Sequence, residues 1–403
     1  MRVSDMGDPA SQSSPARIYW TAFIGLLFDY YDLYLFVYLE KELAAQFALT
    51  PSASNALQFV GLAGVGAGAI IFGWLADRWG RGRVMLAVFG VYALGIAGLS
   101  LAWDYSSLLG FRLLASLALG AEWGISHTYL AERVDRATRY RFAAMLQFAI
   151  LGGLLAALAR NYLLPAWGWR WLFAASIAPV VMLSLARWRV LAKEAEPPRR
   201  KVAEMSDGSA VLPLRTASPG QAGIRGIRAS VRPFAVCLGL ASLTLASGTI
   251  NVFYAKDLPQ TVAYTAFFWS NVIPGLLLGA WTVRRLGVGW ALAVYAAALL
   301  VLSAWAWCSD WPARTLAFAL LLPLLNGLPF GLMGAFFNEV FGPYRTMLSG
   351  AAYNLGRILA GFSPALITAL GLHQNGRYFI FTAALGAGVA FLSIAARRLP
   401  VRL

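Results

Sequence analysis

Long apolar blocks separated by short polar stretches run through most of the chain. A helix that crosses the hydrocarbon core of a bilayer needs about 20 apolar residues, and most of the blocks reach that length. We predict twelve membrane-spanning helices, near residues 17–39, 57–76, 84–103, 106–130, 142–163, 171–190, 233–254, 261–283, 289–308, 314–338, 346–371 and 377–396. The pattern therefore predicts an all-α membrane protein.

Composition and charge agree with this prediction. Apolar residues make up 59% of the 403 residues and charged residues only 13%, whereas about a quarter of a soluble domain is charged. A net charge of +15 would suggest a nucleic-acid ligand in a soluble protein. Most of the 33 Lys and Arg residues, however, fall in alternate loops and in the two tails, which the positive-inside rule assigns to the cytoplasm. We expect a multi-pass protein of the cytoplasmic membrane with both termini inside, surrounded by lipid, without a nucleic-acid partner and functional as a monomer.

The widest interruption in apolar character divides the segments into two sets of six. We predict a cytoplasmic tail at 1–16, a six-helix bundle at 17–190, a cytoplasmic linker at 191–232, a second six-helix bundle at 233–396 and a tail at 397–403. Related positions recur at one spacing: Glu132 and Glu339 are 207 residues apart, and Arg139 and Arg345, like Gly73 and Gly279, are 206 apart. This spacing indicates a duplicated unit with substrate bound between the repeats; chance spacing of common residues is the alternative.

The turn between the second and third segments has the sequence GWLADRWGRGR, at residues 73–83. Gly73 and Gly80 permit close helix approach and a tight turn. Arg78 and Arg81 keep the turn on the cytoplasmic side. A generic positive-inside turn is the alternative to a gating role for these residues.

The acidic residue of this turn, Asp77, lies at a helix end. A carboxylate there can meet the positive N-terminus of a helix from the other half. By symmetry we expect that helix to be the eleventh, which starts near Thr346. Such a contact would latch the cytoplasmic side shut and break as the two halves rock.

This turn resembles the major facilitator superfamily signature Gly-x-Leu-Ala-Asp-Arg-x-Gly-Arg-Arg/Lys. Three further stretches are similar to the proton symporters of metabolites, aromatic acids and sialate within that superfamily: Asp29-Tyr30-Tyr31-Asp32, Arg112 with Gly120-Ala121-Glu122-Trp123-Gly124, and residues 338–345 followed by Tyr353-Asn354-Leu355-Gly356-Arg357. The resemblance implies a carrier of two pseudo-symmetric bundles that works by alternating access. Tyr30 replaces the Gly usual between the two acids, which we expect to narrow or reshape the pocket.

Several charged side chains fall inside predicted spans, where each costs roughly 2.5 to 3.5 kcal/mol if unpaired. They must therefore line a cavity or pair within the bundle. We hypothesise that Asp29 and Asp32, one turn apart, share a poorly hydrated cavity and couple transport to protons. Glu122 with Arg112 is either a proton or substrate relay or an internal packing pair. A fixed Asp–Arg pair that ties helices together is the structural alternative.

The substrate site is expected around Arg357, whose guanidinium can bind an anion through two parallel hydrogen bonds. Tyr30, Tyr31 and Asn354 are expected beside it, with Arg112 as a further substrate ligand. Asn354 is as well explained as a hydrogen-bonding contact between helices.

A ring of opposite charges is expected at the cytoplasmic mouth, where it would gate access. Its members are Glu132, Arg139, Arg141, Glu339 and Arg345. Exposed ion pairs that contribute about 0 to 1 kcal/mol are the alternative.

The function that follows is secondary transport, most simply symport of a small organic anion with protons. No phosphate-binding loop of the Gly-rich Lys-Ser/Thr kind occurs, so we expect no direct ATP drive. Cys237 and Cys308 lie inside apolar segments, so we expect no disulfide framework or metal site, no catalytic residues and no cofactor beyond the proton. A proton-coupled efflux carrier, a membrane enzyme and a non-transporting sensor are the alternatives.

Overall fold

The computed structural model describes residues 15–194, 224–255, 270–342, 344–372 and 377–399. Most of both predicted tails, residues 195–223 of the predicted linker and residues 261–269 of the eighth predicted segment lie outside these ranges. Within them all regular secondary structure is helical, and each of the twelve predicted segments has a helical counterpart. The all-α prediction is confirmed.

The N-terminal half supplies the first six spans. Its elements are α1 (Pro15–Tyr38), α2 (Glu40–Gln46), α3 (Pro51–Trp79), α4 (Arg81–Leu101), α5 (Tyr105–Ala131), α6 (Arg136–Leu146), the 3₁₀ turn η2 (Gln147–Leu151), α7 (Gly152–Leu158), the π turn η3 (Ala159–Leu163) and α8 (Leu164–Glu194). The fifth span is thus assembled from α6 to η3.

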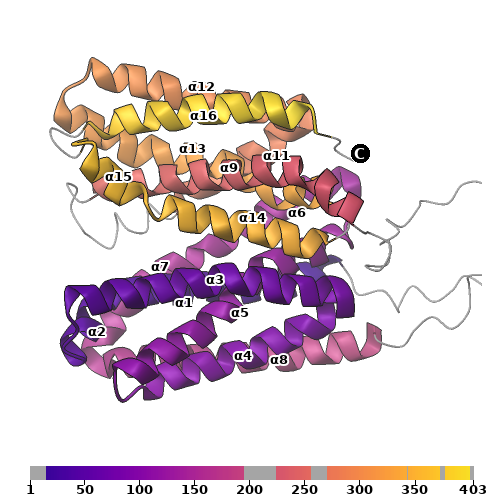
Figure 1. The fold of residues 1–403 in the computed structure, drawn as a ribbon, viewed down its shortest axis with the longest axis vertical. Coiled ribbons are helices and arrows are strands. Elements are labelled where there is room, and N and C mark those ends of the chain that lie inside the picture. Colours follow the sequence, from indigo (N-terminus) through magenta and orange to yellow (C-terminus); the bar gives the residue numbers. More distant parts are fainter. Residues whose placement is uncertain (1–14, 195–223, 256–269, 343, 373–376, 400–403) are drawn as a thin grey trace, which may run out of the picture.

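The C-terminal half lies above the N-terminal half in Figure 1, coloured red to yellow over indigo to magenta. It consists of α9 (Ile224–Ala255), α11 (Val272–Leu286), α12 (Val288–Trp307), α13 (Trp311–Val340), α14 (Arg345–Ala360), α15 (Ser363–Ala369) and α16 (Tyr378–Arg397). Between the halves, α14 packs on α3 and α5, and α13 packs on α6. These contacts bring the second, fourth, fifth, tenth and eleventh spans together at the centre.

Several predicted boundaries need correction. The linker is shorter than predicted, because α8 continues to Glu194 and α9 begins at Ile224. The first span bends by 54° between α1 and α2, and the eleventh is divided between α14 and α15. Helix α8 contains a kink at Gly168, where φ is 74°; this kink separates the fifth and sixth spans. The apolar pattern of the sequence does not reveal such bends and kinks within a span.

Two acidic caps fix the starts of equivalent helices in the two halves. Asp104 accepts a 2.7 Å hydrogen bond from the Ser107 backbone N–H, and Asp310 accepts one of 3.1 Å from the Ala313 N–H. These bonds satisfy free N–H groups of the first turn. The bonds from Ser107 also hold the pKa of Asp104 below its usual value.

Glycine contacts repeat between the halves and support the predicted duplication. A Cβ on Gly68 would lie 1.8 Å from the Leu117 carbonyl oxygen, and a Cβ on Gly275 would lie 1.9 Å from that of Leu324. Both partners are displaced by the same 207 residues. Chance spacing of common residues does not explain a shared pair of backbone contacts.

By length and composition, eight described helices can cross a membrane, and a ninth span arises if α1 and α2 are counted together. Large apolar side chains such as Leu94, Val301 and Phe391 are exposed on the outer surface. Their exposure is typical of a surface that faces acyl chains.

Candidate functional site

The predicted contact of Asp77 with the eleventh helix is confirmed. Asp77 lies in the last turn of α3, and its Oδ1 and Oδ2 accept hydrogen bonds of 3.2 and 2.9 Å from the backbone N–H groups of Thr346 and Met347. Both donors belong to the first turn of α14, where N–H groups lack helical partners and the helix dipole is positive. Arg81 donates to the same carboxylate at 3.0 Å. One side chain thus joins the two halves.

The two glycines of the turn have the roles expected from their geometry. A Cβ on Gly73 would lie 2.6 Å from the Met347 Cα, so only glycine allows α3 to approach α14 this closely. Gly80, the residue that precedes α4, has φ 95°, a conformation that L side chains rarely adopt. Gly287 repeats this geometry at the start of α12, with φ 79°.

Three ion pairs between described residues and one hydrogen bond from a tyrosine hydroxyl surround this contact. Arg81 lies 3.0 Å and Arg345 3.9 Å from Glu132. Arg139 lies 3.4 Å from Glu339, which also accepts a 2.6 Å hydrogen bond from the Tyr140 hydroxyl. We call this group, with Asp77, Thr346 and Met347, the latch. Since Arg345–Glu132, Arg139–Glu339 and Tyr140–Glu339 all connect the two halves, this end of the molecule is closed.

Two predicted gating residues do not belong to the latch. Arg78 is exposed and lies over the Trp74 ring at 5.4 Å. Arg141 is exposed and makes none of these contacts. Both lie on the outer side of their helices, a direction that charge and loop position alone do not reveal.

A small pocket lies between the halves near the middle of the helices. Its lining comprises Leu26, Asp29, Tyr30, Leu33, Leu119, Trp123 and Arg357. The first helix, the fourth and the eleventh therefore meet here. The pocket brings together three residues predicted for the site: Asp29, Tyr30 and Arg357.

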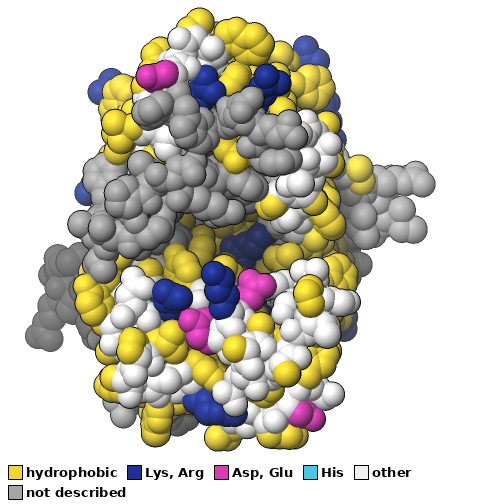
Figure 2. Space-filling view, turned by 90° about the vertical axis from the view of Figure 1, so that its left-hand side faces the viewer, with side chains coloured by type: hydrophobic (Ala, Val, Ile, Leu, Met, Phe, Trp, Pro, Cys, Tyr) yellow, Lys and Arg dark blue, Asp and Glu magenta, His cyan; other side chains and the backbone are white. Residues whose placement is uncertain are grey.

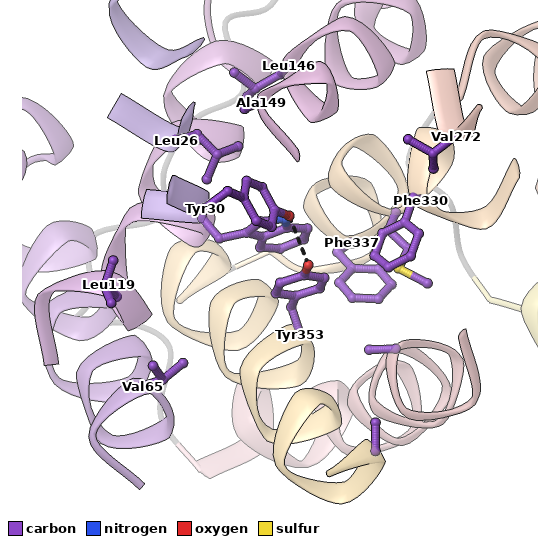
Figure 3. Close-up of a cluster of buried hydrophobic side chains, with 14 of the residues drawn as sticks. Leu26, Tyr30, Val65, Leu119, Leu146, Ala149, Val272, Phe330, Phe337 and Tyr353 are labelled. Carbon is purple, nitrogen blue, oxygen red and sulfur yellow. Dashed lines mark hydrogen bonds between the residues drawn. The ribbon is translucent and has the colours of Figure 1, made fainter. Parts of the chain in front are cut away.

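Two tyrosines close this pocket between the halves. The Tyr30 hydroxyl on α1 lies 3.2 Å from the Tyr353 hydroxyl on α14, and both rings are buried (Figure 3). Arg357 donates to the Tyr353 hydroxyl at 3.4 Å. A guanidinium and two phenols therefore converge on one point, an arrangement suited to a carboxylate.

Aromatic rings extend from this point toward the latch. The Trp123 indole stacks on Tyr353 with ring centroids 4.0 Å apart and planes within 4°. His127 packs on the indole at 4.3 Å, and its Nδ1 lies 2.9 Å from the Trp123 carbonyl. Trp123 and Tyr353 were not predicted as site residues. Both stand inside the motifs that carry the family resemblance, which is the signal that could have found them.

Asp32 does not line the pocket that holds Asp29. It is 1% exposed and accepts a 3.1 Å hydrogen bond from Ser176 on α8, while its Oδ2 has no hydrogen-bond partner among the described residues. The expectation that Asp29 and Asp32 share one cavity is therefore wrong. The two carboxylates face different neighbours.

Arg112 lies beside Asp32 and does not line the pocket. Its guanidinium lies 3.7 Å over the Phe36 ring and attracts Asp32 electrostatically. Gly61 makes room for it, since a Cβ there would lie 2.8 Å from its Nε. The predicted role of Arg112 as a pocket ligand is thus corrected to that of a charge buried beside Asp32.

Three other residues predicted for the site form hydrogen bonds with protein groups outside the pocket. The Tyr31 hydroxyl faces the Leu172 carbonyl of α8 at 3.4 Å. Asn354 donates to the Gly120 carbonyl at 2.9 Å, which is the helix contact foreseen as its alternative. Glu122 accepts a 2.6 Å bond from Ser126, one turn later. None of these three lines the central pocket.

The described parts of the two halves are separated by a recess at the end opposite the latch (Figure 2). Figure 2 views the end that carries α2 and α15, and it shows a recess between the two halves with basic side chains in and beside it. The latch end is thus bridged by charged pairs while this end is hollowed.

Comparison with known proteins gives four findings. A sequence profile of the Major Facilitator Superfamily matches residues 22–258. A niacin transporter of Acinetobacter baylyi is 24% identical over 390 residues, which cover 90% of this chain and 88% of the relative. The cis,cis-muconate transport protein of the same organism is 27% identical over 358 residues, 86% and 85% of the two chains. The solved structure of a proton:xylose symporter has a TM-score of 0.73 at 17% identity over 94% of each chain.

Proposed function

Because this chain belongs to the major facilitator superfamily, it is a transporter and not an enzyme, and we propose that it carries small organic carboxylates together with protons by alternating access. The observation that carries this proposal is the pocket between the halves, where Arg357, Tyr30 and Tyr353 converge. A carboxylate there would accept hydrogen bonds from the guanidinium and from both phenols. It would thereby replace the direct Tyr30–Tyr353 contact.

The substrate class follows from the pocket lining. Apart from the carboxylate of Asp29, aromatic and aliphatic side chains surround a single guanidinium, which suits a small acid with an apolar or conjugated body. The relatives are named for niacin and cis,cis-muconate, both compact unsaturated acids. We assign this chain to that substrate class.

Asp29 regulates the charge of the pocket in this proposal. It lines the pocket together with Arg357, so an ionised Asp29 reduces the attraction of the site for an anion. Its carboxylate therefore limits the affinity and favours release of the substrate.

Asp32 is the proposed proton carrier. A buried carboxylate with one oxygen lacking a donor is costly, and a proton on that oxygen removes the cost. Arg112 supplies the positive charge that receives the carboxylate when the proton leaves. Since Asp32 and Phe36 lie one turn apart on α1, and Arg112 stacks on Phe36, proton loss would pull α1 toward α5 and change the wall of the pocket.

In this proposal, opening and closing of the latch controls access to the pocket from one side of the membrane. The positive-inside rule assigns the latch end to the cytoplasm, and the latch is intact here. The conformation is thus the one that is closed toward the cytoplasm. Opening would break the bonds from Asp77 to α14 and the contacts of Arg345 with Glu132 and of Arg139 and Tyr140 with Glu339. Proton and substrate would then leave on that side.

The experiment that tests the proposal uses the purified carrier in proteoliposomes. Vesicles loaded with unlabelled pyridine-3-carboxylate or hexa-2,4-dienedioate should take up the labelled acid by exchange, and an inward pH gradient should drive accumulation. The Arg357→Ala variant should lose both activities. Absence of exchange for all such acids would contradict the proposal, and expulsion of the acid against its gradient would identify an efflux carrier instead.

A further inference from the structure

One hydrogen-bond donor of the pocket lining, the indole N–H of Trp123, has no acceptor among the described residues. Trp123 is 2% exposed and lines the pocket with Arg357 and Tyr30, yet its indole Nε1 has no hydrogen-bond partner among the described residues. A buried N–H normally has a partner, because leaving one without an acceptor destabilises the structure. Tryptophan has no other polar atom with which to compensate.

Neighbouring rings restrict which part of the indole a ligand can contact. Tyr353 stacks on it in a nearly parallel arrangement at 4.0 Å, and His127 packs on it at 4.3 Å. Phe337 adds an edge contact at 6.0 Å. These rings pack against the indole, and Trp123 still contributes to the lining of the pocket. Nε1–H is the polar atom that its side chain can offer to a ligand there.

We infer that Trp123 determines substrate specificity, by donating a hydrogen bond to a second acceptor atom of the substrate while Arg357 binds its carboxylate. The inference deepens the proposed function and rests on it. The preferred substrates are then small conjugated acids with a second acceptor, such as a ring nitrogen, a carbonyl oxygen or a second carboxylate. Acids of the same size without such an atom are discriminated against.

The expected preference has a clear physical reason. An acid with only one acceptor group fills the pocket but leaves Nε1–H buried and unpaired, and a site that binds a polar group rejects the analogue lacking it. One buried neutral hydrogen bond corresponds to roughly a 5- to 10-fold difference in Kd. A second carboxylate gives the larger difference, because charged acceptors form stronger bonds.

Two matched pairs of acids test this in the full-length carrier by isothermal titration calorimetry. Pyridine-3-carboxylate and benzoate differ only in the ring nitrogen. Hexa-2,4-dienedioate and hexa-2,4-dienoate differ in the second carboxylate. Pyridine-3-carboxylate should bind wild type about 5- to 10-fold more tightly than benzoate, and the ratio should be larger for hexa-2,4-dienedioate over hexa-2,4-dienoate.

Trp123→Phe keeps an aromatic ring for Tyr353 but removes the donor. In this variant the ratio within each pair should fall to about 2-fold or less, through weaker binding of the first member and unchanged binding of the second. Trp171→Phe, at an exposed position of α8, is the matched control and should keep the wild-type ratio.

Equal binding of the two acids within both pairs by wild type would overturn the inference and leave the proposed function intact. This wild-type measurement tests the inference even if Trp123→Phe does not fold. An unchanged ratio in a folded Trp123→Phe protein would also overturn it. If none of the four acids binds wild type, the inference and the proposed function both fall.

Discussion

Asp77 Oδ2 accepts a 2.9 Å hydrogen bond from the backbone N–H of Met347, 270 residues away in the other half of the molecule. The bond exists because a carboxylate at the end of α3 meets N–H groups at the start of α14 that have no acceptor within their own helix. Its strength comes from charge and from the helix dipole. In the proposed alternating-access cycle it would break when the halves separate at this end, so it would stabilise the conformation that is closed there.

Asp77→Asn should shift the carrier toward the conformation open at the latch. Loss of the charge removes about 1 to 2 kcal/mol from the closed state, roughly a 5- to 30-fold change in the equilibrium. Spin labels at the exposed positions Arg83 and Arg285, with Cys237 and Cys308 replaced by Ser, report the distance between the halves. Asp104→Asn, which alters a cap inside one half, should leave the distribution unchanged. A wild-type distribution in Asp77→Asn would argue against the latch.

Gly73→Ala should prevent full closure of the same end. The new methyl group would lie 2.6 Å from the Met347 Cα, a backbone atom that cannot move alone, so α3 and α14 must separate. We expect exchange of preloaded substrate to fall at least about 5-fold, since overpacking of this kind costs about 1 to 3 kcal/mol. Gly90→Ala, on a part of α4 where a Cβ meets nothing within 4 Å, should exchange normally. Equal activity of the two variants would refute the close-packing role.

Glu339→Gln should destabilise the closed latch more than Asp77→Asn does. Glu339 is buried and bonds both Arg139 and Tyr140, so neutralising it leaves the Arg139 charge without its partner, at a cost of about 3 to 5 kcal/mol. The same spin-label distances measure this shift. The double variant Arg139→Gln with Glu339→Gln should recover part of the closed population, because neither charge is then stranded. A double variant that is as open as both single effects added together would show that the pair is not coupled.

Asp32→Asn and Asp29→Asn should affect transport in different ways. Asp32→Asn removes the proposed proton site, so accumulation driven by a pH gradient is lost while exchange of preloaded substrate continues. Asp29→Asn removes a negative charge from the pocket, so gradient-driven accumulation persists and KM for the anion falls several-fold. Gradient-driven and exchange uptake in proteoliposomes distinguish these cases. The reverse pattern would make Asp29 the proton carrier.

Much of the fold and the latch could be predicted from the sequence. Length and apolarity define membrane spans, and the recurrence of Gly73 at Gly279 and of Glu132 at Glu339 indicates the duplication. The duplication in turn places Asp77 opposite the eleventh helix. These predictions depend on chain direction, spacing and charge, which the sequence states directly.

The central pocket was predicted less completely, because side-chain direction depends on packing. Asp29 and Asp32 are three residues apart and therefore about 60° apart around α1, which is enough to turn one toward Arg357 and the other toward Ser176. Trp123 and Tyr353 lie at spacings that fit a helix core equally well. Only the docking of α14 on α5 shows that their rings stack beside a buried guanidinium.

The most direct test of the central claim is the internal pH of proteoliposomes during substrate entry. With a trapped pH indicator and no imposed gradient, external pyridine-3-carboxylate or hexa-2,4-dienedioate should acidify the lumen faster in vesicles with wild-type carrier than in vesicles with Arg357→Ala or without protein. The Asp32→Asn carrier should exchange the acid without this acidification. Carrier-dependent uptake of the acid with no change in internal pH, or acidification equal to that of protein-free vesicles, would contradict proton-coupled carboxylate transport.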